Sequence, residues 1–302
     1  MARLPFIDTH VHFHDMNHPL LRYEWLEPQA PIDPVVGRDG PIRSQSYWAD
    51  DFLAETRFHN VRKVVHVQGA IGSPDPVEET RWLQAFADRL GVPHGIIGYV
   101  DLTRADAEQQ LERHRAFANF RGVRDLRYDD YLSNTAWRRG FALLEAGGLV
   151  CCDDPFVEEM ASARRLAEDH PGVTLCIDHA AYPEHAGKPR VHDRAYFDIW
   201  RKGMRELARA PNVVVKISGL GQSDHRWTTD SIRPWVIECV EAFGVQRTCF
   251  GSNWPVDRLY SSYGDVVDAF AEIISIFSEA EQHALFYANA QRIFQLEDCS
   301  GD

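Results

Sequence analysis

Phe6-Ile7-Asp8-Thr9-His10-Val11-His12 is the stretch that decides the fold, because an apolar run ends here in two histidines at alternate positions. Seven further short runs rich in Val, Ile, Cys or Phe follow along the chain. Near-continuous apolar runs are typical of strands buried on both faces, as in a parallel sheet. The eight predicted strands are Phe6–His10, Lys63–Gln68, Gly95–Asp101, Gly122–Leu126, Leu149–Asp153, Val173–Ala180, Val213–Gly219 and Thr248–Asn253.

Segments with the period of an amphipathic helix separate these strands. They are Tyr47–Phe58, Pro76–Leu90, Leu102–Phe117, Asn134–Ala146, Val157–Asp169, Asp193–Arg209, Ser231–Phe243, Asp265–Phe277 and Glu279–Phe294. Alternating strands and helices predict an α/β fold with a parallel sheet, and eight such units predict a closed (β/α)8 barrel of the TIM type. An open doubly wound sheet is the alternative, but no GxGxxG motif follows the first strand.

We expect one barrel domain over residues 1–302. A long Pro-rich loop insertion at about 17–46 follows the first strand, and such a position is typical of an active-site loop.

Composition argues against several classes of partner. The chain has 32 Lys and Arg against 45 Asp and Glu, a net charge of −13 and no basic run, so nucleic-acid binding is not expected. No run approaches the ~20 apolar residues of a membrane span, and no signal peptide is evident. The six cysteines form no CxxC motif, which indicates buried thiols in a reducing compartment. We expect a cytoplasmic protein with a small-molecule substrate; a homo-oligomer is compatible with the sequence.

Three histidines fall at predicted strand ends. His10 and His12 share one face because side chains alternate along a strand, and His179 lies near the end of the sixth strand. The carboxyl ends of barrel strands line the active site, where neutral imidazoles can bind a divalent metal. The alternatives are a solvated histidine pair and a hydrogen-bonded core histidine.

The eighth predicted strand ends at Asn253, where a carboxylate would bind metal and accept a proton from water. An asparagine amide is a poor zinc ligand and no base. Asp257 lies four residues further on and would substitute if the loop folds back, or it has a plain structural role.

Four residues are predicted to contact the substrate. Arg124 lies near the carboxyl end of the fourth strand, and Arg121 and Arg127 flank that strand. The guanidinium of Arg124 is suited to bind a substrate carboxylate through two hydrogen bonds. An ion pair with Asp125 or Asp129 is the alternative. Lys216 lies inside an apolar strand, either as a cavity group or paired with an aspartate. Gln68 ends the second strand. Trp254 belongs to a set of aromatic residues in predicted strand-end loops, which would form an apolar wall around a ring-shaped substrate or serve ordinary packing. The set is Tyr23, Trp25, Tyr128, Tyr131, Trp227 and Trp254.

At these motifs the chain resembles the amidohydrolase superfamily, and more closely its lactonase branch, which contains fuconolactonase and 2-pyrone-4,6-dicarboxylate lactonase. The matching stretches are Asp8-Thr9-His10-Val11-His12-Phe13, Ile177-Asp178-His179, Val215–Leu220, Phe250–Val256 and Asn289–Phe294. The resemblance implies a distorted (β/α)8 barrel that hydrolyses sugar-acid or dicarboxylate lactones. It also supports Arg124 as the substrate-binding arginine of its strand.

The same resemblance makes His10, His12 and His179 either metal ligands or carbonyl-polarising groups. It implies one divalent metal, zinc or manganese, or a metal-independent site. Two residues depart from the pattern: Asn253 stands where many members have aspartate, and His14 stands where tryptophan is common. The fifth strand offers no histidine, which argues against a binuclear site.

The leading hypothesis is lactone hydrolysis by water attack, with Asp257 or Asp178 as the base. A metal-dependent decarboxylase of a hydroxy-aromatic or muconate-like acid is a second hypothesis. A catalytically degraded binding barrel, suggested by Asn253, is a third.

Overall fold

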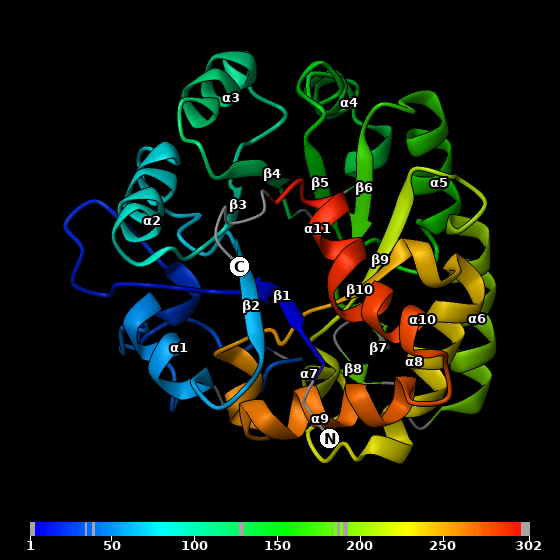
Figure 1. Ribbon diagram of the computed structural model, residues 1–302. Helices are drawn as coiled ribbons and strands as arrows, with labels where there is room; N and C mark the ends of the chain where they lie inside the picture. The colour runs from blue at the N-terminus through cyan, green and yellow to red at the C-terminus, as the bar shows by residue number, and fades with distance from the viewer. Residues whose placement is uncertain are drawn as a thin grey trace.

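The computed structural model describes residues 4–33, 35–37, 40–126, 130–182, 184–185, 188–189 and 193–296. Eight parallel strands form one sheet in the order β1-β2-β3-β4-β5-β6-β9-β10, inside a ring of helices (Figure 1). They are β1 (Phe6–Val11), β2 (Val61–Val67), β3 (Gly95–Gly98), β4 (Phe120–Arg124), β5 (Val150–Asp153), β6 (Thr174–Ile177), β9 (Val213–Ile217) and β10 (Thr248–Phe250). The prediction of eight barrel strands is confirmed.

The two edges of the sheet meet beside β1. Val11 forms a parallel bridge with Trp254, and the backbone N–H of His12 donates to the Trp254 carbonyl at 2.7 Å. The Asp8 carboxylate adds a second link, because it accepts from the Ser252 N–H at 2.8 Å and from the Tyr263 hydroxyl at 3.0 Å. The sheet is therefore a nearly closed (β/α)8 barrel rather than an open doubly wound sheet.

Every predicted helical segment contains a helix, although most helices are shorter than predicted. They are α1 (Ala49–Thr56), α2 (Val77–Leu90), α3 (Ala107–Arg115), α4 (Thr135–Ala142), α5 (Met160–Asp169), α6 (Arg194–Leu207), α8 (Thr229–Phe243), α9 (Tyr263–Ile274), α10 (Glu279–His283) and α11 (Asn289–Ile293). The last predicted helix is α10 and α11 joined by the π-helical turn Ala284–Ala288. Within the described residues, no helix is both long and apolar enough to span a bilayer.

Two strands and one helix that were not predicted are each too short for a periodic pattern to repeat. They are the hairpin β7 (Glu184–His185) and β8 (Lys188–Pro189), and the helix α7 (Leu220–Ser223). The predicted strand Val173–Ala180 also ends early, at Ile177, because Asp178–Ala181 forms a 3-10 turn.

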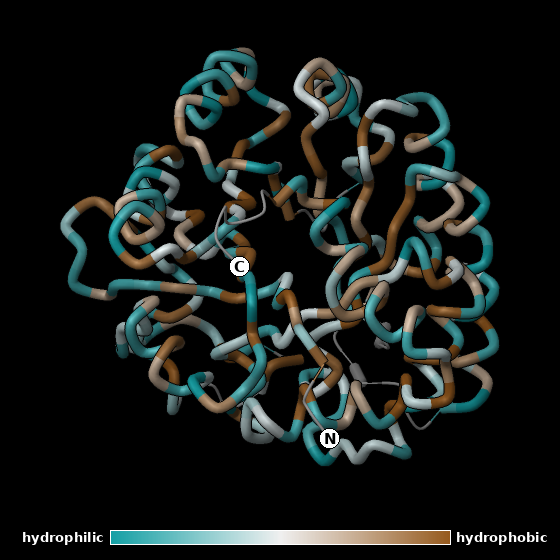
Figure 2. The backbone as a smooth tube through the Cα atoms, in the orientation of Figure 1, coloured by the Kyte–Doolittle hydropathy of each residue, from teal (hydrophilic) through white to brown (hydrophobic). Residues whose placement is uncertain are grey.

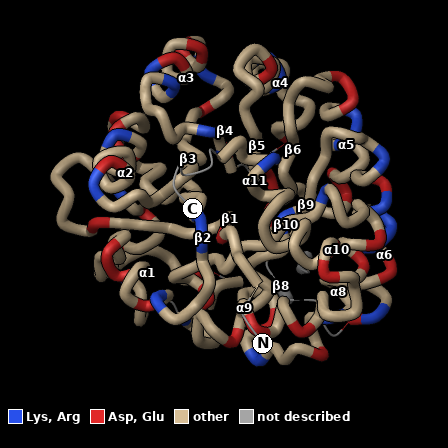
Figure 3. Tube along the Cα trace, viewed as in Figure 1, with Lys and Arg blue, Asp and Glu red and all other residues tan. Residues whose placement is uncertain are grey.

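Two layers of apolar side chains hold the barrel together. One lies between the strands and the surrounding helices, and Figure 2 shows the apolar residues concentrated along the strands. The other fills the barrel interior, where Ile7, Val65 and Ile97 pack with Ile293 and Phe294 of the chain's end. Helix α11 thus closes the amino end of the barrel. Charges of both signs lie over the outer helices (Figure 3).

The described residues of the segment at about 17–46 include side chains that pack beside the carboxyl ends of the strands. Leu21, Tyr23, Leu26 and Ile42 pack together against residues of the loops after β2 and β10, namely Ala70 and Val256. This loop therefore contributes one wall beside the end of β1. That residues 1–302 form one domain stays a prediction.

Candidate functional site

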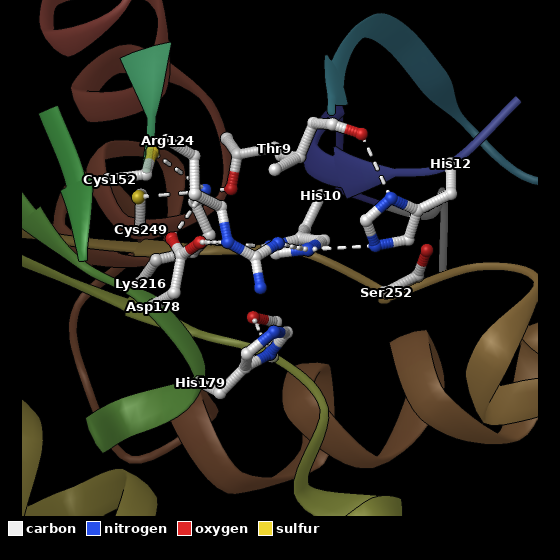
Figure 4. Close-up of polar contacts among 12 residues, drawn as sticks. Thr9, His10, His12, Arg124, Cys152, Asp178, His179, Lys216, Cys249 and Ser252 are labelled. Carbon is white, nitrogen blue, oxygen red and sulfur yellow. Dashed lines mark hydrogen bonds and ion pairs between the residues drawn. The ribbon is translucent and has the colours of Figure 1, made fainter. Parts of the chain in front are cut away.

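The rings of His10, His12 and His179 lie close together at the carboxyl ends of β1 and β6 (Figure 4). Nε2 of His10 lies 3.1 Å from Nε2 of His12, and the ring centroids of His10 and His179 are 4.3 Å apart. All three side chains are buried. The fold thus gathers the three histidines that the sequence predicted as site residues.

The tautomers of His12 and His10 follow from their neighbours, because one neighbour can only accept a hydrogen bond and the other can only donate one. Nδ1 of His12 lies 2.9 Å from the Val67 carbonyl, which can only accept, so this nitrogen carries the hydrogen. The Arg124 guanidinium can only donate, and it lies 3.4 Å from Nε2 of His10. Two lone pairs on Nε2 atoms therefore face each other, an arrangement that calls for a cation or a shared proton between them.

Burial keeps the three imidazoles neutral. It lowers the pKa of His10, His12 and His179 well below the ordinary value. The charge on Arg124 lowers all three pKa values further, and the charge on Lys216 adds to this effect at His10 and His179. Neutral imidazoles are the form that binds metal or accepts a proton.

These residues fit a divalent metal. Two nitrogen ligands of one zinc ion, each roughly 2.0–2.1 Å from it, lie roughly 3–3.5 Å apart, and the Nε2 atoms of His10 and His12 match that separation at 3.1 Å. We therefore consider a mononuclear metal compatible with the site.

Charged groups lie directly beside the histidines. The Asp178 carboxylate lies 2.8 Å from Nζ of Lys216, 3.6 Å from Nε of Arg124 and 3.7 Å from Nδ1 of His10. Burial opposes the charge on Lys216, but Asp178 and the thiols of Cys152 and Cys176 outweigh it, so the pKa of Lys216 is raised. Because Lys216 is fully buried and faces Asp178, we do not include it among the substrate contacts proposed below.

The chain turns in an unusual way to present His179. Residues His179, Ala180, Ala181 and Tyr182 all have positive φ, between 40° and 54°. Left-handed conformation costs roughly 1–2 kcal/mol for each non-glycine residue, so the surrounding packing must hold this turn. The Ser218 hydroxyl lies 3.0 Å from Nδ1 of His179. A Cβ at the next residue, Gly219, would overlap that nitrogen, which explains the glycine.

Asn253 and Asp257, which follow β10, are both buried but have different surroundings. Asn253 is buried with φ of 58°, a conformation that asparagine tolerates, and its Nδ2 finds no hydrogen-bond partner among the described residues. Asp257 lines a small cavity with Leu220 and Trp227, and burial raises its pKa well above the ordinary value, while Asn253 lowers it. Burial therefore favours the protonated form of the Asp257 carboxyl.

Trp254 is packed away from the substrate side. Its indole N–H donates to Glu55 at 3.0 Å, and its ring meets Tyr263 edge-on at 5.5 Å. The indole is fully buried. We therefore assign Trp254 to packing and leave it out of the proposed substrate contacts.

Aromatic side chains lie on two sides of the histidines. Trp25, from the long loop, approaches His12 edge-on at 6.0 Å and donates its indole N–H to the Gly69 carbonyl at 3.0 Å. Tyr182 lies 4.7 Å from the His179 ring. Gln68 is buried directly after β2, next to the Val67 carbonyl that holds His12. Arg127, Tyr128 and Asp129 lie outside the described residues.

Other predicted residues have structural partners. Asp125 accepts from the Leu102 N–H at 3.0 Å and from the Trp137 indole at 3.1 Å. The Tyr131 hydroxyl donates to Asp153 at 2.8 Å. His14 lies among aromatic rings, and burial lowers its pKa to about 4.

The buried Asp153 carboxyl yields a pH-dependence prediction. Burial raises its pKa from 3.8 to about 7, so between these values the folded protein holds a proton that the unfolded chain has lost. The contribution of Asp153 to stability therefore falls as the pH rises from about 4 to about 7 and is constant above. Relative to wild type, Asp153→Asn is expected to gain a few kcal/mol of unfolding free energy across that window. Urea unfolding at a series of pH values measures this; a pH-independent difference between the two proteins would contradict it.

Comparison with known proteins agrees with this geometry. The family model described as "Amidohydrolase" matches residues 7–296. The protein y4mH of Sinorhizobium fredii is 36% identical, over 98% of this chain and 100% of its own length. The L-fucono-1,5-lactonase of Burkholderia ambifaria is 29% identical, over 98% of this chain and 97% of its own.

A solved structure shows the same architecture. An amidohydrolase from Burkholderia multivorans with bound zinc superposes with a TM-score of 0.80 at 26% identity, covering 97% of this chain and 100% of its own. The family model covers nearly the whole chain. The chain therefore belongs to the amidohydrolase family.

Proposed function

We propose that the chain hydrolyses a lactone, the cyclic ester of a sugar acid or of a dicarboxylic acid. The observation that carries this proposal is the convergence of three neutral imidazoles and the Arg124 guanidinium at one end of the barrel. The similarity to an L-fucono-1,5-lactonase supports the substrate class.

Ester hydrolysis needs a polarised carbonyl and stabilisation of the oxyanion that water attack creates. The Arg124 N–H groups donate toward this site and suit the oxyanion or a carboxylate of the substrate. His12, held by the Val67 carbonyl, and His10 direct Nε2 atoms to the same place. A divalent metal held by His10, His12 and His179 would supply Lewis-acid polarisation of the carbonyl.

Proton transfer is assigned to the residues that can carry it. Asp178 faces Lys216, so it is not well placed as the base. In the metal-free site a neutral imidazole with its Nε2 lone pair on the reaction side would take the proton that the attacking water loses. Burial favours the protonated form of Asp257, so this carboxyl would enter the cycle as an acid that donates to the leaving oxygen. That Asn253 takes part in catalysis stays a prediction.

The first test is turnover of candidate lactones. Protein stripped with a chelator and protein reloaded with zinc or manganese are each incubated with L-fucono-1,5-lactone and 2-pyrone-4,6-dicarboxylate. Acid release is followed with a pH indicator, and products are identified by mass spectrometry. Addition of one water supports the proposal. Carbon dioxide release from a hydroxy-aromatic acid, with no ring opening of any lactone, would replace it with a decarboxylase, and binding without turnover would favour a degraded barrel.

Arg124 offers a second prediction. Arg124→Met removes the donors beside Nε2 of His10, so kcat/KM for the lactone is expected to fall about 100-fold. Arg121→Met is the matched control on the same strand, because Arg121 donates to backbone carbonyls of Phe120 and Gln295. Equal kcat/KM losses in both variants would show that Arg124 acts only through stability.

A further inference from the structure

We infer that Asp178 and Lys216 are positioning residues that hold His10 in the tautomer with its hydrogen on Nδ1, which leaves Nε2 as an acceptor on the reaction side. The inference rests on the histidine site of the proposed function. It is tested without any substrate, so it fails separately from the lactonase proposal.

The two ring nitrogens of His10 lie near groups of opposite charge. The Asp178 carboxylate is 3.7 Å from Nδ1, and the Arg124 guanidinium is 3.4 Å from Nε2 (Figure 4). A carboxylate favours a hydrogen on the nitrogen that faces it, and a guanidinium favours a lone pair. Nδ1 of His10 makes no hydrogen bond within the described part of the chain, and the Asp178 carboxylate is the acceptor that faces it at 3.7 Å.

The other tautomer would disable the site. With its hydrogen on Nε2, His10 would donate to Nε2 of His12 across the observed 3.1 Å. That hydrogen bond would occupy both nitrogens that face the reaction side. It would also place the Nδ1 lone pair opposite the negative charge of Asp178. The carboxylate therefore selects the useful tautomer.

The charge of Lys216 compensates the buried charge of the Asp178 carboxylate beside His10. Asp178 and Lys216 are both fully buried, with 0% of either side chain exposed. An isolated buried charge is very costly, whereas a paired one is tolerated. Ile177 of β6 pairs with Val215 of the neighbouring strand β9. The residues that follow this pair are Asp178, just beyond β6, and Lys216, inside β9, so the register brings them side by side.

Asp178 acts through His10 rather than as a metal ligand itself. Lys216 lies 2.8 Å from Oδ1, and Nε of Arg124 lies 3.6 Å from Oδ2. Two cations this close repel a divalent metal from the carboxylate oxygens. A carboxylate behind a ligating histidine, by contrast, fixes the ring and typically contributes 10–100-fold to metal affinity.

The experiment compares Asp178→Asn, Lys216→Met and the double variant D178N/K216M with wild type. Long-range proton–nitrogen NMR on the metal-free proteins reports the His10 tautomer, with the signal assigned through a His10→Ala sample. Titration with zinc alone gives the dissociation constant, and urea unfolding gives stability. Glu79→Gln is the matched control, because Glu79 is a buried carboxylate 3.5 Å from a different histidine, His66.

We expect Nδ1–H in wild type and E79Q, and a shift toward Nε2–H in D178N with a 10–100-fold weaker zinc affinity. The double variant removes both buried charges, so it should regain stability relative to the single variants while keeping the altered tautomer. Recovery of the wild-type tautomer and zinc affinity in the double variant would overturn the inference, because the pair would then be structural only. An unchanged tautomer in D178N would overturn it as well. Should D178N not fold, the double variant still decides the question.

Discussion

Replacing His10 with alanine is expected to lower kcat/KM for the lactone about 1000-fold, comparable to the loss of a central transition-state donor in other hydrolases. The imidazole lies 3.1 Å from His12 and within ring contact of His179, so its removal leaves the remaining two histidines without their common neighbour. Steady-state kinetics on the lactone that wild type turns over, with zinc content measured in parallel, tests this expectation.

The matched control is another buried histidine with no link to the site. Nδ1 of His114 lies 2.8 Å from the Thr80 hydroxyl, and Nε2 lies 3.2 Å from the Tyr99 carbonyl. His114→Gln is expected to lower the unfolding free energy while leaving kcat/KM near wild type. Full turnover in the His10 variant would refute the assignment of the histidine site, whatever the substrate.

Replacing Gly122 with alanine is expected to lower the unfolding free energy by about 3 kcal/mol or more. Gly122 lies in β4, and an added Cβ would overlap the Val150 carbonyl oxygen and lie 3.0 Å from Val150 Cβ. These atoms belong to the neighbouring strand β5, paired at this register, so neither backbone can move without disturbing the barrel. Urea unfolding of the purified variant measures the effect.

Gly40→Ala provides the comparison, because beyond its chain neighbours no atom of the described residues lies within 4 Å of the Cβ it would add. Its unfolding midpoint is expected to stay within experimental error of wild type. If Gly122→Ala were equally harmless, β4 and β5 could not be packed at the register described.

The barrel and its histidines could be predicted because both follow from local patterns. Alternating apolar runs and amphipathic segments repeat along the chain, and a barrel brings all strand ends to one face. His10, His12 and His179 stand at those ends, so their meeting follows from topology. Periodicity alone located each strand to within a few residues.

The partners of these residues could not be predicted, because they depend on contacts between strands. Lys216 was expected to face either a cavity or an aspartate, and only the pairing of β6 with β9 identifies Asp178. Asp178 directly precedes His179, which was the one available signal. The roles of Ser218 and the Val67 carbonyl likewise depend on neighbouring strands.

Loop conformation accounts for the remaining differences. The left-handed turn at His179–Tyr182 carries no glycine, so no residue type announced it. Trp254 belonged to a predicted aromatic wall, but the backbone bridge to Val11 directs its indole toward Glu55.

Closure of the barrel by α11 has a consequence for synthesis on the ribosome. The interior side chains Ile7, Val65 and Ile97 are covered at the amino end by Ile293 and Phe294, among the last described residues. Because the ribosome makes the chain from the amino end, these side chains emerge long before the helix that covers them. A nascent chain that has completed β3 but not yet α11 therefore carries an apolar interior that this helix does not yet cover.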